Sequence, residues 1–193
     1  SFSESIKLNR LSGLADRLVA LEVRSGLGER SLPGLSLLPR LRRLYLTMAT
    51  LRDGSVEPLM SLPELRSLHL DRMRMSDSSF RQLCELSELR ELEIVHSDLG
   101  GHDLSPLSNL TELRRLSLRH VNVDDADVAH LGTLTSLRTL DIANDGISDV
   151  GLAHLSGLTE LRTLALMSRN INDRGLSHLT NLSELRSLLL IGG

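Results

Sequence analysis

The chain of 193 residues has almost no aromatic side chains and a single cysteine. Phe2, Tyr45 and Phe80 are its only aromatic residues, so a core must be built from aliphatic side chains, chiefly leucine. With Cys84 alone, an intrachain disulfide and the cysteine-rich caps of many extracellular repeat proteins are excluded. This cysteine usage favours a reducing, cytoplasmic compartment.

The sequence also lacks a strong net charge and any long apolar run. A net charge of -3 and a pI near 6.2 give no global field that would attract nucleic acid or an anionic membrane, so we expect neither partner. No stretch approaches the roughly 18 uninterrupted apolar residues of a membrane-spanning helix, and residues 1–9 lack the regions of a signal peptide. Glycine-rich phosphate loops, HExxH and CxxC are missing as well, so we expect no enzymatic activity, no cofactor and no metal site.

What the sequence has instead is a repeat of 24 residues without insertions. Each unit opens on the pattern Leu-Arg-x-Leu, which begins at Leu41, Leu65, Leu89, Leu113, Leu137, Leu161 and Leu185. Seven positions are apolar in every one of the six complete units. In the unit 137–160 these positions are Leu137, Leu140, Ile142, Ile147, Leu152, Leu155 and Leu158.

The apolar spacing changes inside each unit, from the alternation of a short strand to the near-helical spacing of a short helix. One unit cannot bury its apolar side chains alone, so the units must stack. We therefore predict an α/β fold, a right-handed solenoid with a parallel β-sheet on the concave face and short helices on the convex face. Residues 1–17 are assigned to an N-terminal capping segment. Residues 18–193 are assigned to the repeat domain, which has one irregular repeat, six 24-residue repeats and a terminal strand.

These units resemble those of the leucine-rich-repeat family over residues 18–190. Leu161 followed by Leu164-Ala165-Leu166 fits its LxxLxL strand. The runs 147–152 and 171–176 resemble the I-x-D-x-G-L signature of 24-residue bacterial repeats and of the longer repeats in F-box proteins. The Asn or Cys that usually follows the strand is replaced by Ala49, Met73, Ser97, Val121, Asp145 and Arg169. The resemblance implies a curved binding scaffold and names no partner.

Two charged ladders follow the repeat. Arginine follows the first leucine of each unit, at Arg42, Arg66, Arg90, Arg114, Arg138, Arg162 and Arg186. Glutamate stands two residues earlier, at Glu64, Glu88, Glu112, Glu160 and Glu184, with Ser136 as the gap. Because residues two apart in a strand share a face, we predict that these ladders neutralise one another within and between units, which argues against an anion groove.

Three further patterns are interpreted as structural. Aspartate precedes the helical leucines at Asp53, Asp77, Asp125, Asp149 and Asp173, where we predict that it caps the helices and does not bind calcium. We predict that His130, His154 and His178 face solvent, because whole helices separate them and they cannot converge on zinc. Cys84 has no histidine at a matching position, so a thiol nucleophile is not expected.

Residues between the buried strand leucines must point to the concave side, because alternate side chains of a strand face opposite ways. This strip varies most from unit to unit and mixes charges, so we predict that it binds a protein partner. The predicted partner-binding residues are Arg43, Tyr45, His69, Asp71, Glu91, Glu93, Arg115, Arg119, Asp141 and Met167.

The last two strands are apolar on this face, at Ala165, Met167, Leu189 and Ile191. We expect the C-terminal edge strand to abut further repeats, another domain or a second copy of the chain. Two alternative functions remain open. The chain could be the substrate-recognition segment of a larger ubiquitin-ligase-like effector or regulatory protein, which would need an F-box or catalytic domain outside these residues. It could also bind an anion or a glycan through the Arg ladder, if that ladder were unpaired.

Overall fold

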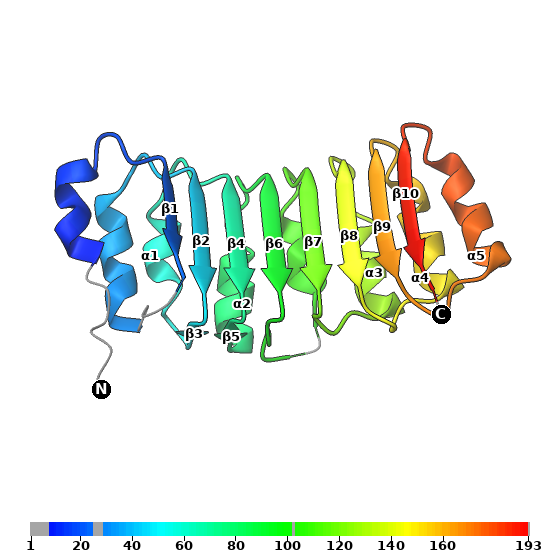
Figure 1. Cartoon of the computed structure of the whole chain (residues 1–193), viewed down its shortest axis with the longest axis horizontal. Helices are drawn as coiled ribbons and strands as arrows, with labels where there is room; N and C mark the ends of the chain where they lie inside the picture. The colour runs from blue at the N-terminus through cyan, green and yellow to red at the C-terminus, as the bar shows by residue number, and fades with distance from the viewer. Residues whose placement is uncertain (1–7, 25–28, 102, 193) are drawn as a thin grey trace.

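Within residues 8–24, 29–101 and 103–192, which the computed structural model describes, eight strands form one parallel sheet (Figure 1). The sheet follows chain order, with one strand from each repeat. Its strands are β1 (Ala20–Val23), β2 (Arg43–Thr47), β4 (Ser67–Asp71), β6 (Glu91–Val95), β7 (Arg115–Arg119), β8 (Thr139–Ala143), β9 (Thr163–Met167) and β10 (Ser187–Ile191).

The register of the sheet advances by one repeat per strand. Leu44 lies opposite Leu68, and Leu68 lies opposite Leu92, so equivalent leucines of successive repeats are neighbours. Between β1 and β2 the step is one residue shorter, since Leu21 lies opposite Leu44. In the sequence, the first repeat has four residues from Val23 to Leu27 where the later repeats have five, as from Ile142 to Ile147, so it is one residue shorter.

Short helices cover the other face of the sheet (Figure 1). They are η1 (Leu8–Leu14), η2 (Glu29–Leu37), α1 (Glu57–Met60), α2 (Asp77–Leu83), η3 (Ser105–Asn109), α3 (Asp125–Leu131), α4 (Asp149–His154), η4 (Leu155–Gly157), α5 (Asp173–Ser177) and η5 (His178–Asn181). Two further strands, β3 (Thr50–Leu51) and β5 (Arg74–Met75), pair in the loops between sheet and helices. The predicted solenoid, with its parallel sheet and opposed short helices, is confirmed.

The core lies between the sheet and the helices and consists of the repeated apolar positions. Of the seven positions in each of the six complete repeats, only Leu86, Ile171 and Leu176 are less than fully buried. In the last strand, β10, the inward-facing side chains are not buried. Leu188 is 44% exposed, whereas its equivalent in β9, Leu164, is 0% exposed. Within the described residues no strand pairs with the outer side of β10, which shows that a neighbouring repeat is needed to bury these positions.

The prediction that the Asp ladder caps the helices is wrong for α2, α3, α4 and α5. The residues that cap them, by accepting a hydrogen bond from a backbone N–H of the first turn, are Ser76, Asp124, Ser148 and Asn172. In these four helices the ladder aspartate is instead the first helical residue, at Asp77, Asp125, Asp149 and Asp173. The capping position is thus one residue earlier than predicted.

The ladder carboxylates instead bind the backbone of the following repeat. Asp125 Oδ1 accepts hydrogen bonds from the backbone N–H of Ser148 (2.8 Å) and of Gly151 (3.0 Å), and Oδ2 accepts one from the Ser148 hydroxyl (2.5 Å). Asp149 accepts one from the backbone N–H of Asn172 (2.9 Å). A Cβ at Gly151 would lie 2.4 Å from Asp125 Oδ1. The Asp and Gly of the I-x-D-x-G-L signature are therefore partners across the interface between two repeats.

One interface uses the reverse arrangement. Gly101 occupies the ladder position of its repeat, and the next repeat has Asp127 where the two repeats after it have glycine. Asp127 Oδ1 accepts a hydrogen bond from the backbone N–H of Leu104, in the preceding repeat. Burial raises the pKa of the Asp127 carboxyl, as expected for a carboxylate enclosed between two repeats. At this interface a carboxylate again binds the backbone of the neighbouring repeat, but it belongs to the later repeat instead of the earlier one.

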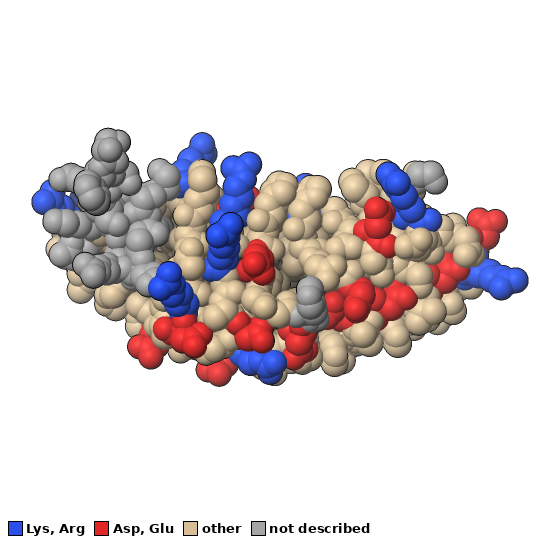
Figure 2. All heavy atoms as spheres, turned by 90° about the horizontal axis from the view of Figure 1, so that it is seen from below, with Lys and Arg blue, Asp and Glu red and all other residues tan. Residues whose placement is uncertain are grey.

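Acidic side chains gather along the edge at which strands end and helices begin (Figure 2). The helix N-termini at this edge carry partial positive charge from their unpaired N–H groups. The acidic band is therefore balanced locally by backbone dipoles and by the hydrogen bonds between repeats.

Replacing a repeated leucine tests the core. We expect Leu140→Ala, at a fully buried position of β8, to lower the free energy of unfolding by about 2–5 kcal/mol, because the substitution leaves a cavity between packed repeats. Urea denaturation measures the loss. The matched control is Val150→Ala, at a side chain that is 61% exposed, and it should change stability by less than about 0.5 kcal/mol. Equal effects of the two substitutions would contradict the assignment of the core.

Comparing two ladder aspartates tests the bonding between repeats. Asp125→Ala leaves two backbone N–H groups and a hydroxyl without their acceptor and should cost about 2–3 kcal/mol in unfolding free energy. Asp173 has the same place at the start of α5 but accepts no hydrogen bond from a later repeat in the described part of the chain. Asp173→Ala should therefore cost less than about 1 kcal/mol. If the aspartates acted as caps, both variants would lose the same stability.

Candidate binding surface on the concave face

The Arg ladder lies at the edge where the strands begin, and most of its members are paired. The ion pairs between ladders are Arg42–Glu64 (2.8 Å), Arg66–Glu88 (3.3 Å), Arg138–Glu160 (3.4 Å), Arg162–Glu184 (3.8 Å) and Arg186–Glu184 (3.2 Å). The hydrogen bond from Arg42 lowers the pKa of the Glu64 carboxyl. The predicted neutralisation is confirmed for these pairs. Arg90 and Arg114 form no ion pair with any residue that the structure describes.

The concave face consists of three rows of side chains that cross the strands in register. From β2 to β9 the first row is Arg43, Ser67, Glu91, Arg115, Thr139 and Thr163. The middle row is Tyr45, His69, Glu93, Ser117, Asp141 and Ala165. The third row is Thr47, Asp71, Val95, Arg119, Ala143 and Met167. All ten residues predicted to bind a partner lie in these rows.

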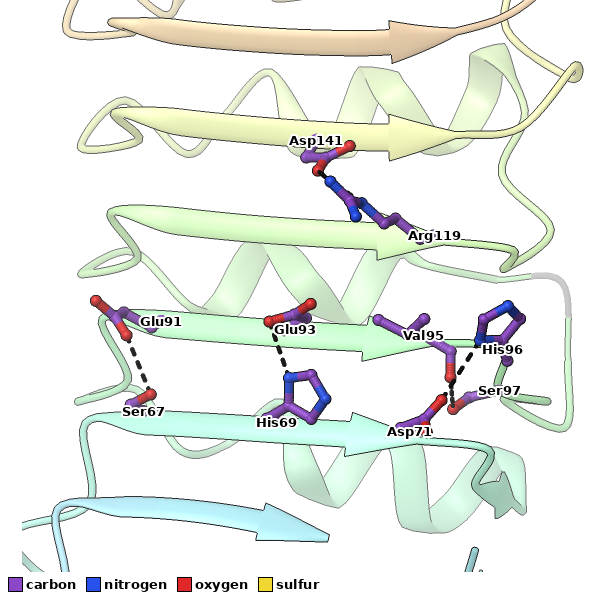
Figure 3. Close-up of polar contacts among 10 residues, drawn as sticks. All are labelled: Ser67, His69, Asp71, Glu91, Glu93, Val95, His96, Ser97, Arg119 and Asp141. Atoms are coloured by element: carbon purple, nitrogen blue, oxygen red, sulfur yellow. Dashed lines mark hydrogen bonds and ion pairs between the residues drawn. The ribbon is translucent and has the colours of Figure 1, made fainter. Parts of the chain in front are cut away.

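The first three side chains of the middle row, Tyr45, His69 and Glu93, contact one another in order. The rings of Tyr45 and His69 have centroids 5.1 Å apart. Glu93 Oε2 lies 2.8 Å from His69 Nδ1, outside the direction of a hydrogen bond but within reach of an ion pair (Figure 3). The hydroxyl of Ser117, the next residue of the row, is buried and has no hydrogen-bond partner among the described residues. These contacts fix the aromatic and charged groups of the row before any partner arrives.

A second fixed pair links the third row to the middle row. The Nε of Arg119 donates a hydrogen bond to Asp141 Oδ2 (2.7 Å), and a terminal guanidinium nitrogen donates to the same oxygen (Figure 3). This bonding raises the pKa of Arg119, with a smaller contribution from the charge of Glu93. In contrast, Arg43 and Arg115 form no ion pair within the part of the chain that the structure describes.

The sequence analysis missed a column of residues that directly follows the strands. Met48, Arg72, His96 and His120 adopt left-handed backbone conformations, with φ between 49° and 55°. The rings of His96 and His120 stack with centroids 4.4 Å apart, and His96 Nδ1 lies 3.4 Å from Asp71 Oδ1 (Figure 3). Non-glycine residues rarely adopt this conformation, so composition could not predict it. The sequence did contain one signal for this column: His96 and His120 occupy equivalent positions of neighbouring repeats.

A hollow of about 260 Å³ lies over β7 to β10 and has two chemically different sides. Its polar side contains Arg119, His120 and Asp141. Its apolar side contains Ala143, Ala165, Leu166, Met167, Leu189 and Ile191. Met167 is 42% exposed, so the apolar strip predicted for the last strands does form an accessible surface.

Among the described residues we find neither a metal-binding cluster nor a reactive thiol. No group of three His, Cys, Asp or Glu residues among them could hold a metal ion. Burial raises the pKa of the Cys84 thiol to about 12, so the thiol stays protonated near neutral pH. The predicted solvent-facing histidines of the convex helices, His130, His154 and His178, are exposed. No helix in the described ranges has the length and apolar character needed to cross a membrane.

Comparison with known proteins gives structural neighbours only. No family model matches the sequence, and no curated protein matches it significantly. Internalin C2 of Listeria monocytogenes is 25% identical with a TM-score of 0.64, and the match covers 96% of this chain and 84% of that one. The Arabidopsis receptor kinase HAESA, solved with the peptide hormone IDA and the co-receptor SERK1, is 22% identical with a TM-score of 0.63 over 90% of this chain. TLR13, solved with ssRNA13, is 17% identical with a TM-score of 0.68 over 98% of this chain.

The chain spans about a third of the two receptors, 31% of the TLR13 chain and 34% of the HAESA chain. All of these neighbours are built from leucine-rich repeats, and the chain shares their parallel sheet and short helices. The chain is therefore a leucine-rich-repeat protein, and its fold is that of a binding scaffold.

Proposed function

We propose that the chain is a protein-interaction scaffold that binds a protein partner on its concave face. The observation that carries this proposal is the contrast between constant and varied positions. The leucines and the interface aspartates recur because stacking requires them, whereas the three concave rows change from one repeat to the next. A rigid surface with fixed spacing and varied chemistry suits specific recognition. Neighbours solved with macromolecular or peptide partners support a binding role of this kind.

The centre of the proposed surface is the stretch of the middle row from Tyr45 to Asp141. Tyr45 is 36% exposed and rests against His69, so its ring can cover a partner without losing much conformational freedom. Glu93 and Asp141 are each held by a neighbour on the same face. Aromatic and arginine side chains in a fixed arrangement are the usual anchors of protein interfaces.

A protein partner fits this surface better than a nucleic acid. Asp71, Glu91, Glu93 and Asp141 place four carboxylates on the concave face. A phosphate backbone laid along the rows would meet these carboxylates, and nucleic-acid binding depends on neutralising phosphates with basic groups. The ssRNA bound by TLR13 is a property of that protein.

The hollow over β7 to β10 would hold an aliphatic side chain of the same partner, with the Arg119–Asp141 pair at its rim. The contact predicted for the C-terminal edge strand remains a separate proposal. The apolar side chains of β10, 36–53% exposed, would be covered by further repeats, another domain or a second copy.

Site-specific photo-crosslinking tests the proposed face. A photoreactive residue at position 69, on the concave middle row, should capture a defined partner in cells that express the protein. The matched control is the same residue at position 154, which is exposed on the convex helix α4. Capture at position 69 should fall at least about tenfold when Tyr45→Ala and Glu93→Ala are added, because each removes an anchor of the interface. Equal capture at the two positions, or capture that survives these substitutions, would place the binding surface elsewhere.

A further inference from the structure

A cavity of about 400 Å³ lies at the edge of the concave face where the first strands begin. Four arginines line it: Arg42, Arg43, Arg66 and Arg90. They stand at or directly before the start of β2, β4 and β6, which are consecutive in the sheet and about 4.8 Å apart from one strand to the next. Arginines of three repeats therefore line one cavity.

Two of these arginines are held by groups outside the cavity. Arg42 pairs with Glu64 at 2.8 Å, and Arg66 pairs with Glu88 at 3.3 Å. Arg66 also donates a hydrogen bond to the carbonyl oxygen of Leu65 at 2.9 Å. These two side chains are thus part of the Arg–Glu ladder, and each already has a carboxylate partner.

The other two arginines have no counter-ion among the residues that the structure describes. Arg43 and Arg90 are exposed, and neither forms an ion pair within the described residues. Arg43 belongs to the first row, where the next strand has Ser67 and the one after it has Glu91. Glu91 is the one acidic residue among those that line the cavity, and it accepts a hydrogen bond from the Ser67 hydroxyl (3.1 Å).

The charge around the cavity is positive although the chain as a whole is negative. Arg40 also binds Glu64, at 3.0 Å, so five arginines face three carboxylates, Glu64, Glu88 and Glu91, in this region. The whole chain has a net charge of -3. Farther along the same ladder, Arg138 and Arg162 are each paired with a glutamate. Arg114, one repeat beyond Arg90, also forms no ion pair among the described residues, but it does not line the cavity. The cavity itself has an excess of positive charge.

We propose that this cavity is an oxyanion site, which binds a phosphate or carboxylate group between Arg43 and Arg90. A guanidinium group matches the spacing of two oxygens on either kind of group and donates two parallel hydrogen bonds. Val19, which is 44% exposed, gives the cavity one apolar wall. The site goes beyond the proposed function, because a small anion occupies it without a protein partner.

Calorimetry with pyrophosphate and with citrate tests the site in a low-salt buffer that contains no other multivalent anion. We expect pyrophosphate to bind with a 1:1 ratio. The double variant Arg43→Ser, Arg90→Gln should weaken binding at least about tenfold, because each lost charge-assisted contact costs about that factor or more. Serine is the residue that the neighbouring strand already has at the position of Arg43, so the double variant should keep the fold, which circular dichroism verifies.

The matched control is Arg162→Gln, in the same ladder but paired with Glu184 and outside the cavity. It should bind pyrophosphate as the unaltered chain does. If citrate alone binds and the double variant loses it, the site takes carboxylates and the proposal holds for that arm. The proposal is overturned if neither anion binds at millimolar concentration, or if the double variant binds as well as the unaltered chain. An equal loss in the Arg162→Gln control also overturns it, because binding would then follow the overall charge.

Discussion

The structure depends on one constraint: the leucines of a repeat can be removed from water only by the neighbouring repeats. Each repeat supplies one strand, one short helix and seven apolar side chains, which is too little to enclose a core alone. Stacking in register solves this, because Leu44, Leu68 and Leu92 then lie side by side and are each at most 1% exposed. At β10, which pairs with a single strand among the described residues, the equivalent Leu188 is 44% exposed.

The same constraint divides the polar residues into two groups. Those that recur bind one another at fixed positions of the repeat: Asp125 binds the backbone of Gly151 in the next repeat, and Arg138 pairs with Glu160 at the end of its own repeat. Those that vary lie on the concave rows, where stacking makes no demand on side-chain identity. The proposed binding functions use positions of the second kind, such as His69 and Glu93, together with Arg90, a ladder residue without an ion pair among the described residues. Binding can therefore change without loss of the fold, because the two sets hardly overlap.

Much of the fold could be predicted from the sequence, because the spacing of apolar residues within each 24-residue repeat already indicates the strand and the helix. The spacing of Leu137, Leu140 and Ile142 specifies a strand and, with it, which side chains face the concave side. The role of Asp125 could not be predicted locally, since its acceptor atoms serve donors 23 and 26 residues later in the chain. The left-handed backbone conformation of His96 was missed for a different reason. Glycine is the residue that usually indicates this conformation in a sequence, and position 96 is not a glycine. The oxyanion cavity depends on side-chain directions in three repeats at once, and periodicity does not contain that information.

Native-state hydrogen exchange of the strand amides tests the central constraint most directly. If each repeat is stable only through its neighbours, protection should be greatest in β6 and β7, which have several repeats on both sides, and should fall toward β1 and β10. The amides of β10, whose leucines are exposed, should exchange fastest among the strands of the sheet. Protection in β10 equal to that in β7 would contradict the account, because it would show that a repeat holds its structure without a neighbour on each side.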